Sequence, residues 1–127
     1  MRRATVAMIM ALGAVGLWAG GPQAAAEGDA ARGRKAYELW CIGCHGDKQR
    51  IESVGPSLVG LLGRRAGTVD GSPYSRNLYQ ANIVWDERSL DRYLAAPTGA
   101  VHGTIMPVGL QDARERADVI AYLKTLK

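Results

Sequence analysis

The chain has 127 residues, a length that suits one domain together with a leader. Its 16 Lys and Arg exceed its 12 Asp and Glu, but residues 1–26 hold two of the arginines and no acidic residue, so residues 27–127 carry a formal charge of only +2. An excess this small does not indicate a nucleic-acid-binding or membrane-surface protein.

The N-terminal segment has the layout of a secretory signal peptide. Residues 1–3 are Met-Arg-Arg, an apolar stretch follows over residues 4–19, and residues 24–26 are the three alanines of an Ala-x-Ala cleavage site. The apolar stretch is shorter than the roughly 20 residues that span a bilayer. We therefore expect a cleavable signal peptide at 1–26 and a periplasmic domain at 27–127 without stable membrane insertion. A retained membrane anchor is the alternative.

The exported domain is predicted to begin with a helix. Asp29 is placed to cap it, and apolar residues recur at helical spacing as far as about Trp40. Gly33 would weaken the middle of this helix unless another backbone packs closely against it. We therefore expect a close contact between backbones at Gly33.

The two cysteines of the chain lie in the sequence Cys41-Ile42-Gly43-Cys44-His45. Thiols three residues apart lie about one helical turn from each other, on the same side of the chain. That spacing suits the two neighbouring vinyl groups of a haem and places His45 over the porphyrin face. Because Cys-x-x-Cys-His is the signature of c-type haem attachment, we expect one haem c bound covalently through Cys41 and Cys44, with His45 as a metal ligand.

Three other interpretations of the two cysteines are less well supported. A thioredoxin-like redox pair requires a strand before the motif, whereas the residues before Cys41 have a helical pattern. A structural zinc site would need a fourth ligand, for which His102 is the candidate, and such sites usually contain a second closely spaced ligand pair. A disulfide between Cys41 and Cys44 would close too small a loop to stabilise the fold much.

The stretch from Gly46 to Gly71 is rich in glycine and reads as irregular. Residues 57–62 are expected to form a short turn of helix, and residues 73–81 another short helix. So long a glycine-rich stretch is unusual in a compact domain unless the loops wrap a large rigid ligand. Because the chain contains no Phe, its own core is thin, and a buried porphyrin would supply the missing apolar volume.

Two further helices are predicted in the C-terminal part. The first runs from Asp86 to about Ala95 and ends before Pro97. A loop at 98–110 follows, and Asp112 caps the last helix, with Glu115 three residues on in the position of a capping box. This helix places four apolar residues on one face, namely Val119, Ile120, Leu123 and Leu126.

The loop at 98–110 holds the candidates for a second iron ligand. Without the leader, Met106 is the only methionine and His102 the only histidine besides His45. The distal ligand is then Met106, His102, a lysine, or none. A thioether favours ferrous iron, so a His/Met pair would raise the reduction potential and leave no open coordination site.

Taken together, these residues resemble class I cytochromes c, in the branch that contains the mitochondrial and bacterial periplasmic proteins. The resemblance covers residues 28–127 and implies an all-α cytochrome c fold, in which helices and long loops wrap around one covalently attached haem. It rests on the haem motif with Gly33 and Tyr37 before it, the run Gly55-Pro56-Ser57-Leu58-x-Gly60-Leu61-Leu62-Gly63-Arg64, the pair Tyr74-Ser75, Trp85, Tyr93-Leu94-x-x-Pro97, Gly103-Thr104-x-Met106 and Asp118-x-Ile120-Ala121-Tyr122-Leu123-Lys124.

The resemblance also implies roles for individual residues. It makes Met106 the distal ligand, with the hydroxyl of Tyr93 near its sulfur, and the Pro56 carbonyl the group that orients the His45 ring. It packs the first and last helices together through Gly33, Tyr37, Ile120 and Tyr122. It matches three further residues to the partners of the inner haem propionate: Arg64, Tyr74 and Trp85. Ordinary core packing is the alternative for Tyr74, Trp85 and Tyr93.

Three departures from the family pattern concern the surface around the haem edge. Trp40 stands where a lysine is common, and Val108 replaces a bulky aromatic residue. Residues 98–110 contain no Lys or Arg. The ring of lysines typical of the family is therefore largely missing, which argues against docking by strong positive steering.

The function implied is that of a soluble periplasmic one-electron carrier, not an enzyme. Its partners would be redox proteins, namely a reductase or dehydrogenase and a terminal acceptor, with no role for nucleic acid. One alternative is a dedicated haem subunit that accepts electrons within a periplasmic dehydrogenase complex. Another is a haem enzyme or gas sensor with an open iron site.

Overall fold

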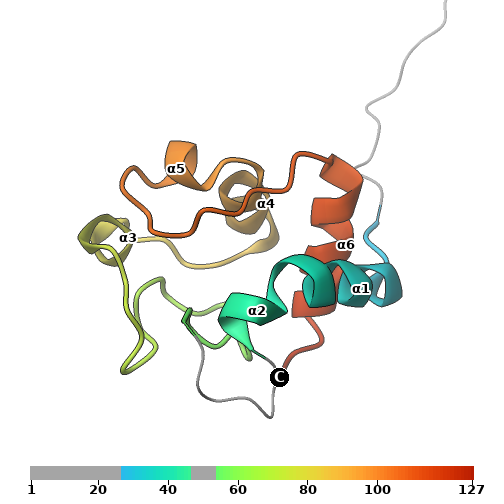
Figure 1. Ribbon diagram of the computed structural model, residues 1–127, viewed down its shortest axis with the longest axis horizontal. Helices are drawn as coiled ribbons and strands as arrows, with labels where there is room; N and C mark the ends of the chain where they lie inside the picture. Colours follow the sequence, from blue (N-terminus) through green and yellow to red (C-terminus); the bar gives the residue numbers. More distant parts are fainter. Residues whose placement is uncertain (1–26, 47–53) are drawn as a thin grey trace, which may run out of the picture.

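The computed structural model describes residues 27–46 and 54–127, and the predicted signal peptide lies outside them. Figure 1 shows the arrangement of six helices in these ranges, which are α1 (Ala30–Trp40), α2 (Ile42–His45), α3 (Arg76–Gln80), α4 (Glu87–Ala95), α5 (Pro97–Ala100) and α6 (Ala113–Leu123). The described part contains no strand, only an isolated antiparallel bridge between Arg65 and Val84. The expected all-α class is confirmed. None of the described helices is long and apolar enough to span a bilayer.

Two helix starts agree with the structure, because α1 and α6 are capped by the expected residues, Asp29 and Asp112. Asp29 accepts the N–H of Arg32 at 2.8 Å, and Asp112 accepts that of Glu115 at 2.8 Å. At α4, Asp86 and Ser89 form a reciprocal capping box. These bonds satisfy backbone donors that the first turn of a helix leaves without a partner.

Two expectations about the loops were wrong. Residues 57–62 form hydrogen-bonded turns rather than a turn of helix, because Gly60 and Gly63 have φ angles of +65° and +81°, outside the right-handed helical region. Residues 97–100, of which 98–100 were expected to be loop, form the single-turn helix α5, whose first residue Pro97 has the fixed φ that suits that position. Helix α3 begins after its cap Ser75, later than the predicted start at residue 73.

The helices α1 and α6 cross in close contact, as Figure 1 shows for the blue-green and red helices. A Cβ added at Gly33 would lie 1.8 Å from the carbonyl oxygen of Asp118, so only glycine allows this approach. The rings of Tyr37 and Tyr122 pack beside it with centroids 5.2 Å apart. The predicted close contact at Gly33 is therefore confirmed.

A charged network joins the start of α1 to α6. The Asp118 carboxylate, buried in this contact, accepts from Arg32 at 2.7 and 2.9 Å and from the backbone N–H of Asp29 at 2.6 Å. The hydrogen bond from Arg32 is the main reason why the pKa of Asp118 lies below its ordinary value. The first and last elements of the domain are thus joined by backbone packing and by a paired buried charge.

The remaining core lies between α4 and α6. Leu90 and Leu94 of α4 and Val119 and Leu123 of α6 are buried against one another. The same four side chains line the cavity described below, so core and site share one apolar wall.

We expect Asp118→Asn to lower the free energy of unfolding by about 2 kcal/mol at neutral pH, because a hydrogen-bonded buried charge is removed. The lowered pKa means that the ionised carboxylate contributes stability above its unfolded-state pKa and loses it as pH falls through the folded-state pKa. The difference between wild type and variant should therefore vanish in acid. Chemical denaturation at a series of pH values measures it.

Glu87→Gln is the matched control, since the Lys124–Glu87 ion pair is exposed on both sides. Its loss should lower the free energy of unfolding by less than about 1 kcal/mol. An Asp118→Asn effect no larger than this, or one independent of pH, would contradict the assignment.

Candidate functional site

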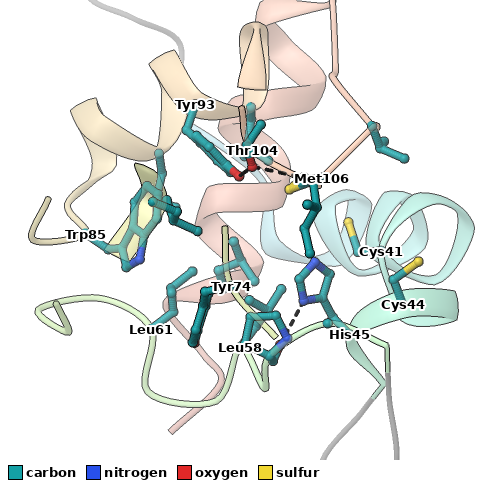
Figure 2. A pocket seen from close by; sticks show the side chains of 18 of the residues that line it. Cys41, Cys44, His45, Leu58, Leu61, Tyr74, Trp85, Tyr93, Thr104 and Met106 are labelled. Carbon is teal, nitrogen blue, oxygen red and sulfur yellow. Dashed lines mark hydrogen bonds between the residues drawn. The ribbon is translucent and has the colours of Figure 1, made fainter. Parts of the chain in front are cut away.

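A cavity of about 340 Å³ opens between the haem motif, the loops and helices α4 and α6, and its lining is mainly apolar. That volume is within the usual range for small-molecule sites. Figure 2 shows side chains from distant parts of the sequence converging on it. All nine site residues predicted from the sequence line the cavity, namely Cys41, Cys44, His45, Pro56, Arg64, Tyr74, Trp85, Tyr93 and Met106.

The two cysteines lie on one edge of the cavity because a helical turn continues past α1. The N–H groups of Cys44 and His45 both donate to the Cys41 carbonyl, at 3.1 and 2.9 Å, and α2 carries the chain on to His45. Cys41 is buried and Cys44 exposed, and both thiols are free. The local backbone therefore presents two thiols about one turn apart beside a histidine, as the spacing predicted.

The environment of Cys41 argues against a thioredoxin-like pair. Burial, with smaller contributions from Glu115 and Cys44, raises the pKa of the Cys41 thiol to about 11. Redox-active Cys-x-x-Cys motifs need the opposite shift, because the thiolate is the nucleophile. For the zinc interpretation, the described residues contain no group of three or more His, Cys, Asp and Glu side chains placed to hold a metal ion.

The His45 imidazole has a fixed orientation. Its Nδ1 lies 2.8 Å from the Pro56 carbonyl oxygen, and because a carbonyl can only accept, Nδ1 carries the proton. Burial lowers the pKa of His45, while the bond to Pro56 opposes the shift. The lowered pKa favours the neutral ring with its proton on Nδ1, in which Nε2 offers a lone pair, the state in which histidine binds a metal.

Gly55 lies against this ring, a contact that the sequence analysis did not anticipate. A Cβ at this position would come within 2.9 Å of two ring atoms of His45, and the Gly55 N–H donates to the Cys44 carbonyl at 2.7 Å. Glycine thus lets the loop pass closely enough for Pro56 to reach the imidazole.

Of the two candidate distal ligands, Met106 lines the cavity and His102 does not. Figure 2 shows Met106 beside Thr104, with His45 beside the cysteines. The exposed His102 is held through its backbone, since its carbonyl accepts from the Asn77 amide at 2.6 Å. The structure therefore favours the methionine over the histidine.

The loop that carries Met106 is held from several sides. The hydroxyls of Tyr93 and Thr104 lie 2.6 Å apart, and Thr104 also accepts the Met106 N–H at 3.4 Å. At the end of the loop, the Leu110 N–H donates to the Leu94 carbonyl at 2.7 Å, and Arg116 donates to the Leu110 carbonyl at 2.9 Å. The sequence motif included Thr104 but gave no sign of this role.

The cavity lining also includes Arg64, Tyr74 and Trp85, which the resemblance matches to the partners of the inner propionate. Arg64 donates to the carbonyls of Ser57 at 2.6 Å and Val59 at 2.9 Å, and burial lowers its pKa. Among the described residues, no carboxylate lies within 4 Å of its guanidinium. A half-buried cation without an acidic partner is suited to an incoming anionic group.

The two aromatic residues differ in their contacts. The Tyr74 hydroxyl accepts the Val69 N–H at 3.3 Å and is only partly buried. Trp85 is buried, and its ring centroid lies 5.2 Å from that of Tyr93. Trp85 therefore has a packing role in addition to its place in the cavity.

Comparison with known proteins gives consistent matches along the domain. The sequence profile of the family described as Cytochrome c matches residues 30–127. The chain is 44% identical over 101 residues to cytochrome c of Euglena viridis, covering 79% of this chain and 99% of that one. It is 42% identical over 101 residues to cytochrome c2 of Rhodopila globiformis, covering 79% and 95%. Among solved structures, cytochrome cH from Methylobacterium extorquens matches with a TM-score of 0.71 and 41% identity, over 77% of this chain and 99% of that one.

We expect Gly55→Ala to displace the His45 ring, because the new methyl group would overlap it. Overpacking of this kind should lower the free energy of unfolding by about 1–3 kcal/mol and alter the absorption spectrum of the haem-loaded protein. Gly43→Ala is the control, since a Cβ there has open space within 4 Å. Equal behaviour of the two variants in denaturation and absorption measurements would refute the proposed contact.

Proposed function

The chain belongs to the cytochrome c family, and from that premise we propose a periplasmic one-electron carrier in which His45 and Met106 are the axial ligands of its iron. Like other members, it is an electron-transfer protein with one covalently attached c-type haem. The observation that carries the proposal is the pairing of an oriented, neutral His45 with Met106 in the lining of one cavity. The predicted signal peptide supports the periplasmic location.

The residues present fit a c-type haem. The cavity lining is mainly apolar, as a porphyrin requires, and both thiols of the attachment motif lie at its edge. When bound, the haem supplies a one-electron couple between ferric and ferrous iron. Cys41 and Cys44 would hold it covalently, and the hydrogen bond from His45 to Pro56 would keep the ring nitrogen Nε2 directed at the metal.

Met106 and the residues around it would close the second axial position. Tyr93 and Thr104 restrict the backbone of the loop on which Met106 lies, and Met106 itself is partly buried. With both positions filled by protein ligands, no open site is left for oxygen or another gas, which favours electron transfer over enzymatic or sensor chemistry.

Arg64, Tyr74 and Trp85 would receive the inner propionate. Arg64 has already lost part of its hydration and has only backbone carbonyls as partners among the described residues. A carboxylate beside it would gain charge-assisted hydrogen bonds. Burial lowers the pKa of the Arg64 guanidinium, and Tyr74 is near enough to oppose this shift in part.

Electrons would pass through an exposed edge of the site where apolar residues gather. Trp40, Ile105 and Val108 all line the cavity mouth, and the first two are exposed. Residues 98–110 contribute no formal charge. An apolar docking face would therefore select partners by surface complementarity rather than by strong electrostatic steering.

We expect Met106→Ala to open the axial position and to lower the reduction potential, within the roughly 0.8 V range that axial ligands determine. The near-infrared charge-transfer band of the ferric protein, which reports a thioether bound to iron, should disappear. A redox-poised absorption titration of the exported holoprotein measures both effects. Fast carbon monoxide binding to the ferrous variant should accompany them.

His102→Ala is the matched control and should leave the band and the potential as in wild type. Unchanged ligand-field spectra in Met106→Ala would rule out Met106 as a ligand. Absence of the band from wild type, together with fast carbon monoxide binding, would instead support the open-site alternative. Stable co-purification with a catalytic subunit would favour the dehydrogenase-subunit alternative over a free carrier.

We also expect the rate of electron transfer with a redox partner to depend weakly on ionic strength, because uncharged surfaces are not screened by salt. Stopped-flow measurements between about 0.01 and 0.15 M ionic strength test this. Over that range the Debye length falls from about 30 to 8 Å. Ile105→Lys should make the dependence steeper. A wild-type rate that collapses across this range would contradict an apolar docking face.

A further inference from the structure

We infer that Glu115 fixes the Trp40 indole as the central contact for a redox partner whose docking surface is apolar and lacks an acidic rim. The inference rests on the proposed electron-carrier function and names the kind of partner that its site accepts.

Trp40 is placed where a partner must approach. It is the last residue of α1, directly precedes Cys41 and lines the cavity mouth, yet 48% of its surface is exposed. The exposed part of the indole is apolar surface that contact with a partner would remove from water. At the edge of the site, it offers a partner the largest apolar contact that a single side chain can provide.

Glu115, in the C-terminal part of the chain, holds the Trp40 ring in one position. Its Nε1 donates to the Glu115 carboxylate at 3.0 Å, across a sequence separation of 75 residues. Glu115 is itself fixed in the first turn of α6, where its N–H donates to the cap Asp112. A side chain oriented before binding loses less conformational entropy in the complex, so this hydrogen bond favours association.

Two further exposed side chains of the cavity lining are apolar. Ile105 and Val54 line the same cavity and are 64% and 74% exposed. Fixed aromatic side chains surrounded by apolar neighbours are typical of the residues that dominate binding energy in protein interfaces.

The charged group bonded directly to the indole is a carboxylate. The Glu115 carboxylate is bound to Trp40, and the neighbouring Arg116 is directed away, to Asp91 at 2.7 Å. Arg32 is likewise bound elsewhere, to Asp118 at 2.7 Å. An acidic docking surface would therefore meet a carboxylate at the contact, whereas an apolar surface without acids would not be repelled.

The test is voltammetry of the holoprotein on gold coated with monolayers of defined chemistry. One monolayer ends in a mixture of methyl and hydroxyl groups, and the other ends in carboxylates. We expect wild type to exchange electrons faster on the uncharged layer. Trp40→Lys should lower that rate by roughly tenfold and raise the rate on carboxylates, since a central tryptophan is lost and a cation is gained.

Two substitutions of Glu115 separate its effect on the orientation of the indole from the effect of its own charge. Glu115→Gln keeps an oxygen acceptor for the indole N–H and should retain the rate on the uncharged layer, while Glu115→Ala should lower it several-fold. Leu39→Ser is the matched control, because Leu39 is 70% exposed on the same helix but does not line the cavity. It should leave both rates as in wild type.

Different outcomes overturn different claims. A reversible couple that is faster on carboxylates in wild type, or rates in Trp40→Lys that match wild type, would overturn the inference and leave the electron carrier standing. If Leu39→Ser lowered the rate on the uncharged layer as much as Trp40→Lys, the protein would adsorb through any exposed apolar residue. That result would also overturn the inference. The absence of a reversible couple on both layers would overturn the proposed function, and the inference with it.

Discussion

The contact between α1 and α6 determines where everything else in the domain lies. With hydrogen at the Cα of Gly33 in place of a side chain, the two backbones meet directly, and this fixes the direction in which α1 ends. Its end leads into the turn that presents Cys41 and Cys44, while the start of α6 brings Glu115 to Trp40. A single close approach thus positions the attachment motif and the residue that orients the docking surface.

The opposite side of the site depends on loops, and loops need anchors because they lack regular hydrogen bonding. The bond from His45 to the Pro56 carbonyl ties one loop to the motif, and Gly55 makes the approach possible. The Met106 loop is held by Tyr93 through Thr104 and by Arg116 at its end. Residues of both loops line the cavity, so each loop supplies part of its wall.

Much of this arrangement could be predicted from the sequence, for identifiable reasons. Capping residues at Asp29, Asp86 and Asp112 act locally, so their helices were correctly placed. The haem motif and the role of Gly33 could also be predicted, because each depends on a short stretch of sequence. The turn of helix predicted at 57–62 was wrong because Gly60 and Gly63 adopt positive φ angles that a right-handed helix does not allow. The contacts of Gly55, Thr104 and Glu115 could not be predicted, since each depends on a partner that only the fold brings near.

The unequal exposure of the two thiols has a consequence for how the protein matures. In the folded domain Cys41 is buried with a pKa of about 11, whereas Cys44 remains exposed. A chain that completed its helix packing first would shield one thiol in its unreactive, protonated form. Packing of the helices therefore disfavours reaction at Cys41, so covalent loading is favoured before compaction is complete.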